Sequence, residues 1–395
     1  MKVVKDPIHG YILLDDLALE LIDTPEMQRL RRIRQLGLSN LVYPGANHTR
    51  FEHSLGTLHL ADQLLGQLDV AGKDRGEVRA AALLHDVGHG PFSHAMEGLI
   101  IQHTGRSHDD VEKLISNSTI AEVLDAHSLD PAHIAQLIKG ETAYGQLINS
   151  ELDVDRMDYL TRDAHYTGVA YGVIDYVRLI HEMEIQNQNL VVGEGGLQAV
   201  ESLLVSRFLM HPTVYYHHVS RIGEAMLVHA VEALLRAGLE PAMLREMDDY
   251  ELIMTLRSSE GYSRDIIARI DQRRLFKRAL YVGKDMVNVE KMLMLRGQTE
   301  KIENEIAEEA GVQEGYVLLD IPRRPEIIEM RAKILVNGKM KRLDEASHLV
   351  NILVDVQWDN WKLGVYAPEE YKGAVEQVAK EMLDVKKPLV QQRFC

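Results

Sequence analysis

Histidines and aspartates, whose side chains readily bind metal ions together, gather in three short stretches of this 395-residue chain: Arg50–His53, Leu84–His94 and Asp153–Tyr159. The second stretch contains the adjacent pair His85-Asp86. Neighbours on a helix project about 100° apart, so this pair can reach one ion only from the side. Further ligands must come from other helices, and the candidates are His53 on an apolar helix face and Asp155 at a helix start. Two imidazoles and two carboxylates suit Mn, Fe, Co, Ni or Mg better than a closed structural zinc site.

Each of these residues has an ordinary structural explanation when it is taken alone. A single buried histidine such as His53 is commonly a hydrogen-bonded core residue, and His85-Asp86 could be a hydrogen bond at a helix end. However, His89 and His94 follow the pair closely, and His89 lies between two glycines. Burying so many ionisable groups costs on the order of several kcal/mol unless they are paired or bound to an ion. The cluster as a whole therefore favours a metal site.

The elements that must position these residues are expected to be mainly helical. Apolar residues recur at helical spacing on two faces between Phe51 and Leu68, which predicts a buried helix that carries His53. A helix start is predicted at Ser107. Further helices are predicted over residues 77–86, 155–163, 199–209, 223–237 and 266–280.

Strand signals stand near the two ends of the chain. Residues 3–14 predict a short hairpin around Asp6-Pro7-Ile8-His9-Gly10. In the last third we predict a strand over 316–321, a two-residue turn at Asn337-Gly338 and an amphipathic helix over 369–383. We therefore expect a mainly α fold, with a helical core over residues 1–314 that includes the hairpin and a small α+β region over residues 315–395.

Composition narrows the classes of partner. Sixty acidic residues against 44 lysines and arginines give a net charge of −16, which argues against an extended surface for nucleic acid or anionic membrane but allows a local basic pocket. The single cysteine, Cys395, excludes an internal disulfide and fits a reducing cytoplasm. The first residues lack the apolar core of a signal peptide, and no uncharged run approaches the ~20 residues that span a bilayer. We therefore expect a cytoplasmic protein without membrane contact.

An ordered set of motifs resembles the HD-domain phosphohydrolases, and within them the deoxynucleoside triphosphate triphosphohydrolases. The likeness covers about residues 2–230 and continues more weakly at 273–277. It implies an HD-domain helical bundle, and we expect no sterile-alpha-motif domain, which some members of this branch carry. The motifs are Asp6–Gly10, Asp23–Pro25, Gln28–Arg31, Gln35–Gly37, Tyr43–Ala46, Arg50–Gly56, His85–His94 and Asp153–Asp163.

The resemblance implies a role for each matching residue. It assigns a divalent metal ion (Mn, Mg, Fe, Ni, Co or Zn) to His53, His85, Asp86 and Asp155. It assigns substrate phosphates to Arg50 and Arg156, the deoxyribose to Tyr159 and Asp163, sugar and base contacts to Gln35 and Leu36, and exclusion of a 2′-hydroxyl to Tyr215. It also aligns Asp23, Gln28 and Arg31 with a regulatory nucleotide site between subunits. The alternative for these last three is a solvated helix face with ordinary ion pairs.

Proton transfer and charge stabilisation fall to a further group of residues. His108 is our candidate general acid, with Glu97 orienting it and favouring the imidazolium form. We expect His108 in the first turn of its helix, where the helix dipole alone disfavours a positive charge. His89 and His94 would stabilise the negative charge of the transition state together with the arginines.

These assignments predict an enzyme that hydrolyses dNTPs to deoxynucleoside and inorganic triphosphate, with a metal-activated water attacking the α-phosphorus. One alternative is an HD-type phosphodiesterase or nucleotidase acting on other nucleotides. A second is a nucleotide-sensing binding protein with little turnover. The expected partners are a deoxynucleotide substrate, an activating nucleotide and further copies of this chain in a homo-oligomer.

Overall fold

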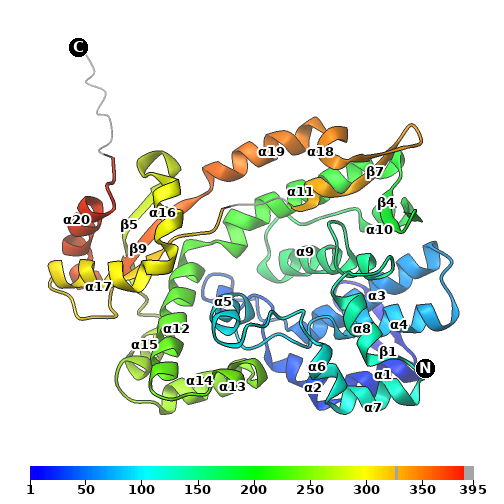
Figure 1. Cartoon of the computed structure of the whole chain (residues 1–395), viewed down its shortest axis with the longest axis horizontal. Coiled ribbons are helices and arrows are strands. Elements are labelled where there is room, and N and C mark those ends of the chain that lie inside the picture. The colour runs from blue at the N-terminus through cyan, green and yellow to red at the C-terminus, as the bar shows by residue number, and fades with distance from the viewer. Residues whose placement is uncertain (325–327, 387–395) are drawn as a thin grey trace. The chain divides into compact units, whose positions relative to one another are not determined.

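The computed structural model describes residues 1–324 and 328–386 (Figure 1). Contacts divide the described chain into two compact units that interleave along the sequence. Unit 1 contains residues 1–217, 235–255 and 328–351, and unit 2 contains residues 218–234, 256–324 and 352–386. Among the described residues, no helix is both long and apolar enough to cross a membrane.

Unit 1 is mainly helical, as the sequence predicts (Figure 1). Its helices are α1 (Asp16–Ile22), α2 (Pro25–Arg29), α3 (Arg50–Gln67), α4 (Gly72–Leu84), α5 (Ser93–Thr104), α6 (Glu112–Ser116), α7 (Thr119–Ala126), α8 (Pro131–Ile138), α9 (Val154–Thr167), α10 (Tyr176–His181), α11 (Leu197–Met210), α13 (Pro241–Glu246) and α18 (Leu343–Ala346). Helix α3 packs against both α4 and α9. It is buried on more than one face, which confirms the prediction from its apolar pattern.

Two small sheets belong to unit 1. Strands β1 (Lys2–Asp6) and β2 (Gly10–Leu14) form the predicted N-terminal hairpin. The second sheet has the order β3-β4-β7-β8, from Met183–Gln186, Asn189–Val192, Lys333–Val336 and Lys339–Arg342. Strands β7 and β8 form the predicted hairpin at Asn337 and Gly338, which both have positive φ. Strand β7 also pairs in parallel with β4, a long-range contact that the sequence does not indicate.

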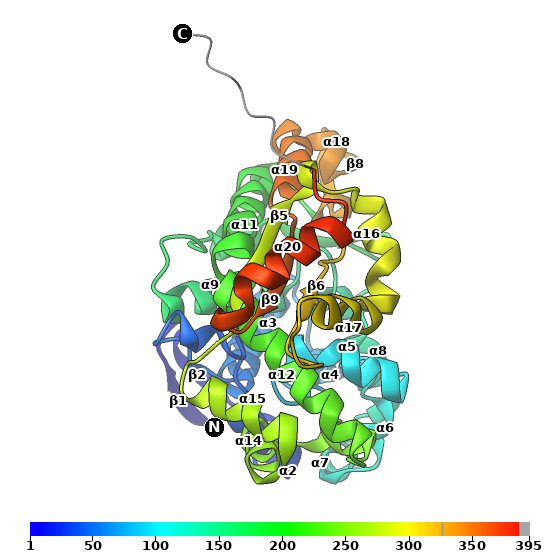
Figure 2. The same cartoon turned by 90° about the vertical axis from the view of Figure 1, so that its left-hand side faces the viewer.

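Unit 2 combines helices with a three-stranded antiparallel sheet of order β5-β9-β6, from Lys277–Gly283, Lys362–Ala367 and Leu318–Asp320. Its helices are α15 (Gly261–Asp271), α16 (Val289–Leu295), α17 (Thr299–Glu309) and α20 (Lys372–Met382). Helices α12 (His218–Arg236), α14 (Asp249–Ser258) and α19 (His348–Asp359) continue across unit boundaries. Helix α20 packs on β5 and β9 (Figure 2).

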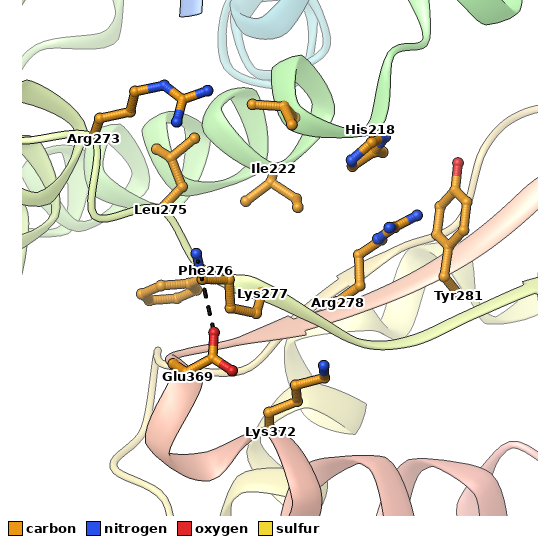
Figure 3. Close-up of a pocket in the computed structure, with 11 residues that line it drawn as sticks. His218, Ile222, Arg273, Leu275, Phe276, Lys277, Arg278, Tyr281, Glu369 and Lys372 are labelled. Atoms are coloured by element: carbon orange, nitrogen blue, oxygen red, sulfur yellow. Dashed lines mark ion pairs between the residues drawn. The ribbon is translucent and has the colours of Figure 1, made fainter. Parts of the chain in front are cut away.

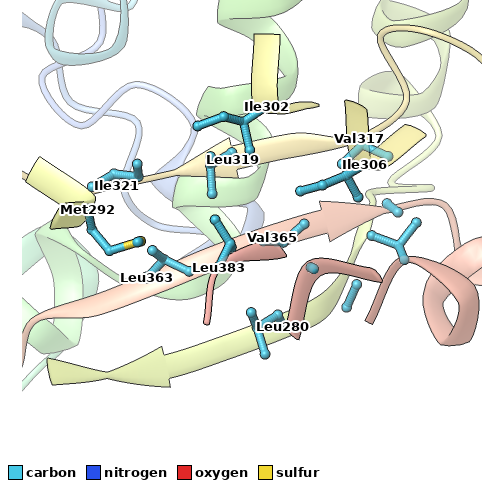
Figure 4. Close-up of a cluster of buried hydrophobic side chains, with 14 of the residues drawn as sticks. Leu280, Met292, Ile302, Ile306, Val317, Leu319, Ile321, Leu363, Val365 and Leu383 are labelled. Atoms are coloured by element: carbon cyan, nitrogen blue, oxygen red, sulfur yellow. The ribbon is translucent and has the colours of Figure 1, made fainter. Parts of the chain in front are cut away.

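The apolar core of unit 2 fills the space between this sheet and its helices. Leu280 of β5 and Leu363 and Val365 of β9 meet Ile302 and Ile306 of α17 in one buried cluster (Figure 4). Strand β5 corrects our prediction of a helix over 266–280, because α15 ends at Asp271 and Arg273 adopts a positive φ of 54°. The chain then continues as a strand that pairs with β9.

The contact pattern does not follow a division between residues 314 and 315. Strand β5, before that point, shares a sheet with β6 and β9 after it. The hairpin β7–β8 belongs to unit 1 rather than to a separate C-terminal region. Whether residues 1–314 and 315–395 also behave as separate domains stays a prediction.

Candidate functional site

Two helices bring the imidazoles of His53 and His85 together, edge to face, with 5.0 Å between ring centroids. His53 lies in the first turn of α3, and His85 caps the C-terminus of α4, which ends at Leu84 rather than at Asp86 as predicted. Their Nε2 atoms are 3.2 Å apart. Asp86 adds a carboxylate oxygen 3.4 Å from Nε2 of His85. The donor atoms of these three buried residues lie within 4.8 Å of one another, close enough to hold one metal ion.

A fourth donor comes from α9. Asp155 lies in the first turn of this helix, after the N-cap Asp153. Its Oδ1 lies 2.8 Å from Nε2 of His53 and 3.6 Å from Nε2 of His85. The structure therefore brings together the four side chains that the sequence proposed as ligands.

The chemistry of this donor set fits a divalent cation. Nδ1 of His85 donates to the carbonyl oxygen of Ala82 at 2.8 Å, and Nδ1 of His53 donates to Oδ2 of Asp158 at 2.7 Å. With both Nδ1 atoms so engaged, the two Nε2 atoms lie 3.2 Å apart beside Oδ1 of Asp155, an arrangement that a cation stabilises. Burial alone would lower the pKa of His53, but hydrogen bonds to Asp155 and Asp158 outweigh it and raise the pKa to about 10. The site therefore favours positive charge.

Arg50 lies beside the donor set with an unused hydrogen-bond donor. Its side chain is 2% exposed, and it donates from Nη1 to Oδ2 of Asp86 at 2.8 Å and from Nε to Oγ of Ser93 at 2.9 Å. Although burial opposes ionisation of Asp86, this guanidinium and the neighbouring histidines hold the pKa of Asp86 well below its usual range. Nη2 of Arg50 is buried and has no hydrogen-bond partner among the described residues. That nitrogen is available for an anionic oxygen of a ligand.

The second arginine assigned to phosphate is engaged elsewhere. Arg156 forms an ion pair with Asp153 and donates to the carbonyl oxygen of Ser150, so it stabilises the start of its own helix. Both contacts are made by Nη1 of Arg156. Its assigned role stays a prediction.

The residues assigned to the sugar form a connected group. The carboxylate of Asp163, which is 1% exposed, lies 2.8 Å from Nε2 of His48 and accepts a hydrogen bond from the Tyr215 hydroxyl at 2.9 Å. Tyr215 stands in a π-helical turn, His211–Tyr215, that follows α11. The Tyr159 ring lies 6.3 Å from the Tyr215 ring and 6.4 Å from the His53 ring, measured between centroids. This group therefore adjoins the donor set.

The proposed acid and its partner also meet. Nδ1 of His108 is hydrogen-bonded to the Glu97 carboxylate, and its ring stacks on His89 with 4.1 Å between centroids. Burial lowers the pKa of His108, but the Glu97 carboxylate outweighs burial and raises it. His89 is 3.2 Å from Asp86, while the His94 ring lies 6.4 Å from the His89 ring and is exposed.

The helix prediction for His108 is wrong. Helix α6 begins at Glu112, and His108 lies in a turn before it. A Cβ atom at Gly88 would lie 2.0 Å from the carbonyl oxygen of His108, so this close packing requires glycine. Backbone contact, rather than a helix terminus, therefore holds His108 near the site.

The remaining predicted residues lie in the segments that lead into α3. Gln35 and Leu36 are buried, and the amide of Gln35 donates to the carbonyl oxygen of His48 at 3.0 Å. Asp23 caps the C-terminus of α1 and is exposed. The side chain of Gln28 accepts from Nε of Arg31 at 2.9 Å and donates to the carbonyl oxygen of Ile22 at 2.8 Å.

Sequence reasoning gave no role to a buried set of charged residues behind His53. Asp158 and Arg162 are four residues apart on α9 and form an ion pair with no exposed side-chain surface. His9 and Asp6 of the N-terminal hairpin bind them. The spacing of Asp158 and Arg162 on the same helix face as Val154 was an available signal, because charges on a buried face need partners.

A separate pocket of about 560 Å³ lies within unit 2 (Figure 3). Its walls come from α12, from the segment that leads into β5, from β5 itself, and from the start of α20 with the turn before it. Among the side chains that line it, the acidic Glu369 lies 4.0 Å from Lys277. The cationic residues are Arg273, Lys277, Arg278 and Lys372. This excess of positive charge favours anionic ligands over cationic ones.

Comparison with known families covers most of the chain. The family described as HD domain matches residues 50–163, which contain all four proposed ligands. The family described as HD associated region matches residues 174–394.

Several relatives match over long stretches. An uncharacterised protein of Methanocaldococcus jannaschii is 36% identical, over 98% of this chain and 85% of that protein. The deoxynucleoside triphosphate triphosphohydrolase SAMHD1 of Homo sapiens is 30% identical over 91% of this chain, which spans 64% of the human protein. The chain spans 54% of YwfO of Bacillus subtilis, which is 40% identical over the matched region.

Solved structures are similar along nearly the whole chain. A hypothetical protein from Aquifex aeolicus has a TM-score of 0.78 at 30% identity and covers 96% of this chain. A phosphohydrolase from Bacteroides thetaiotaomicron has a TM-score of 0.75 at 26% identity and covers 93%. Both structures are covered over 100% of their own length. With the His85-Asp86 motif directly after α4 and both family regions matched, the chain belongs to the HD-domain phosphohydrolase family.

Proposed function

We propose that this protein hydrolyses dNTPs to a deoxynucleoside and inorganic triphosphate with the help of a divalent metal ion. The observation that carries the proposal is the convergence of His53, His85, Asp86 and Asp155 beside the unused Nη2 of Arg50. The name of the human relative supports the substrate class, because that protein is a deoxynucleoside triphosphate triphosphohydrolase.

The four donors would hold the ion, which when bound supplies Lewis-acid polarisation of phosphate oxygen and lowers the pKa of water. The guanidinium of Arg50 would bind a phosphate oxygen through Nη2 and offset its charge. Water adds to the α-phosphorus and its proton passes to the solvent, while the bond to the 5′ oxygen breaks. His108, kept protonated by Glu97, would donate a proton to that leaving oxygen. His108 would regain a proton from the solvent, while Glu97 holds the imidazole in place for the next turnover.

Recognition of the sugar would rest on Asp163 and the two tyrosines. Asp163 is fixed by His48 and Tyr215, so its orientation is set before substrate binds. The rings of Tyr159 and Tyr215 meet edge to face beside His53. A ring at this place would leave little room for a 2′-hydroxyl group and would favour deoxyribose.

A product analysis tests the proposal. The purified protein is incubated with each dNTP and Mn²⁺ or Mg²⁺, and the products are separated by ion-exchange chromatography. Triphosphate and deoxynucleoside are expected; release of pyrophosphate or orthophosphate overturns the reaction. The Asp86→Ala variant should lose metal binding and turnover, whereas Asp74→Ala, an exposed aspartate on α4, should keep both.

Two alternatives remain within reach of the same experiment. A phosphodiesterase or nucleotidase would use the same donor set, and monophosphates or diesters would then be turned over faster than dNTPs. A nucleotide-sensing protein would bind dNTPs tightly and release no product over long incubation. The complete donor set favours an enzyme over a sensor.

Regulation by a second nucleotide is part of the proposal, together with a cytoplasmic homo-oligomer. The guanidinium of Arg31 lies 3.6 Å over the ring of Phe51, which neighbours Arg50 at the start of α3. A nucleotide bound near Asp23, Gln28 and Arg31 would thereby influence the proposed active site. Turnover of each dNTP measured with and without a second nucleotide, in the wild type and in Arg31→Ala, tests this part. Equal activation of both proteins contradicts a role for Arg31.

A further inference from the structure

The buried carboxylate of Asp158 connects the N-terminal hairpin to one of the proposed metal ligands. Its Oδ2 accepts a hydrogen bond from Nδ1 of His53 at 2.7 Å, and its Oδ1 accepts one from Nε2 of His9 at 2.6 Å. All three side chains have 0% exposure. A path of two short hydrogen bonds, closed to solvent, therefore runs from the tip of the hairpin to the ring of His53.

A second connection holds the hairpin at the same place. Arg162 donates from Nε and Nη2 to both oxygens of Asp158, at 2.8 and 3.0 Å, and from Nη1 to Oδ2 of Asp6 at 2.8 Å. Oδ1 of Asp6 in turn accepts hydrogen bonds from the backbone amides of Ile8 and His9, at 2.9 and 2.8 Å. The turn between β1 and β2 is thus bound to α9 through two side chains.

Helix α3 is shaped to fit this cluster. A Cβ atom at Gly56, one turn beyond His53, would lie 1.9 Å from Oδ1 of Asp158 and 2.4 Å from Nη2 of Arg162. Only glycine lets the helix approach the two charges so closely. The cluster, defined as Asp6, His9, Asp158 and Arg162, is therefore packed directly against the backbone that carries His53.

We propose that His9, through Asp158, is a positioning residue of the metal site, so that the N-terminal hairpin fixes the orientation and tautomer of His53. This inference rests on the proposed function, because it requires a divalent ion at His53. A carboxylate behind a ligating histidine fixes the ring and makes it more basic, and loss of such a partner weakens metal binding by about 10- to 100-fold. His9 lies one hydrogen bond further out, so we expect an effect near the lower limit, about tenfold.

Direct titration of the metal-free protein with Mn²⁺ tests the proposal. His9→Leu removes the donor and keeps an apolar side chain of similar size, whereas His9→Gln keeps an N–H near the position of Nε2. Tyr11→Ala, at an exposed position of the same hairpin, is the matched control. The dissociation constant, measured by calorimetry and from the electron paramagnetic resonance signal of free Mn²⁺, should rise about tenfold in His9→Leu. It should return toward the wild-type value in His9→Gln and stay unchanged in Tyr11→Ala.

A merely structural role of His9 gives a different result. Thermal unfolding of the metal-free variant would then occur at lower temperature while the dissociation constant for Mn²⁺ stayed unchanged, and this outcome overturns the inference. A wild-type protein that binds no Mn²⁺ contradicts the proposed metal site itself. A wild-type protein that binds Mn²⁺ and hydrolyses no dNTP contradicts the proposed reaction and leaves the positioning role standing. The failures are therefore distinguishable.

A measurement on the wild type covers the case in which His9→Leu does not fold. Coupling between two sites is reciprocal, so Mn²⁺ must also stabilise the hairpin turn. Hydrogen exchange of the Ile8 and His9 amides, both bonded to Asp6, should slow when Mn²⁺ saturates the protein. The turn at Asn187 and Gln188, between β3 and β4, is the control, and its amides should exchange equally fast with and without Mn²⁺. Equal exchange of the hairpin amides with and without Mn²⁺ overturns the inference.

Discussion

At the scale of single residues, Glu97 controls the protonation of His108. Burial lowers the pKa of His108, and the Glu97 carboxylate outweighs burial and raises it. A general acid must be protonated to act, so activity falls as pH rises through its pKa. In Glu97→Gln the pKa of His108 should fall, and the alkaline limb of the pH profile of kcat should move to lower pH. Gln102→Ala, at an exposed position of the same helix, should leave the profile unchanged. An unshifted limb in Glu97→Gln contradicts the role of His108.

The Tyr215 ring and its hydroxyl should have separable effects. The hydroxyl donates to Asp163 at 2.9 Å, while the ring fills space beside Tyr159. If the ring excludes a 2′-hydroxyl, Tyr215→Ala should reduce the preference for dNTPs over rNTPs by about tenfold or more, the range that pocket shape supplies. Tyr215→Phe should keep this preference and mainly affect KM. The ratio of kcat/KM for dATP and ATP measures it, and an unchanged ratio in Tyr215→Ala would mean that another residue discriminates.

Glu303 predicts a pH dependence of stability. Its side chain is buried on α17 and accepts a hydrogen bond from the backbone amide of Leu319 at 2.6 Å. Burial, together with the charges of Glu232 and Glu300, raises the pKa of Glu303 to about 8. A carboxyl group with a raised pKa in the folded state stabilises it fully below the unfolded pKa of about 4.3, and this contribution is lost as pH rises toward 8.

Glu303→Gln should therefore remove a decline on the order of a few kcal/mol in the free energy of unfolding between pH 5 and 8. Urea unfolding of the wild type and the variant across this range measures the difference. Glu308→Gln, exposed on the same helix, should retain the wild-type slope. Parallel slopes for Glu303→Gln and the wild type would show that Glu303 stays ionised when folded.

The sequence identified the proposed ligands but not the residues behind them. His53, His85 and Asp86 could be predicted because their types, their grouping and the resemblance to a family all indicate metal binding. Asp158 lies within the motif Asp153–Asp163, but the sequence alone indicated no role for it. Its function depends on His9, which is 149 residues away, and that pairing follows from the packing of α9 against the hairpin rather than from any local pattern.

At the scale of elements, two glycines of α3 should respond to alanine in opposite directions. A Cβ at Gly56 would overlap Asp158 and Arg162, whereas a Cβ at Gly66 meets nothing within 4 Å. Gly66→Ala should stabilise the protein by about 0.5–1 kcal/mol, because alanine loses less backbone entropy in a helix. Gly56→Ala should destabilise it by about 1–3 kcal/mol through overpacking. Urea unfolding measures both, and equal effects would mean that the cluster can move away from α3.

Local signals predicted elements well where local chemistry decides them. Asn337-Gly338 has the positive φ values of a tight hairpin turn, and that turn was predicted. The helix prediction over 266–280 is wrong in its second half. Leu275, Phe276 and Leu280 follow the apolar residues Ile266 and Ile270, and their apolar character extended the predicted helix. Strand β5 instead gains its hydrogen bonds from β9, about 80 residues later, and such pairing is not visible in a local window.

At the scale of the whole molecule, the interleaving of the two units is the feature that sequence reasoning could not supply. Unit 2 is assembled from three separate segments, and its sheet joins strands from either side of residue 315. Helices α12, α14 and α19 continue across the boundaries between units.

These shared helices predict that metal binding to unit 1 stabilises unit 2. The proposed ion binds residues of unit 1, whereas the two tryptophans of the chain, Trp358 and Trp361, belong to unit 2. At a Mn²⁺ concentration 100 times the dissociation constant, binding stabilises the folded state by about 2.7 kcal/mol. Unfolding one unit would break helices that continue into the other, so we expect one cooperative transition. Tryptophan fluorescence and circular dichroism should therefore show the same shift to higher urea with Mn²⁺ in the wild type and none in Asp86→Ala. A shift in circular dichroism without one in fluorescence would show that the units unfold independently.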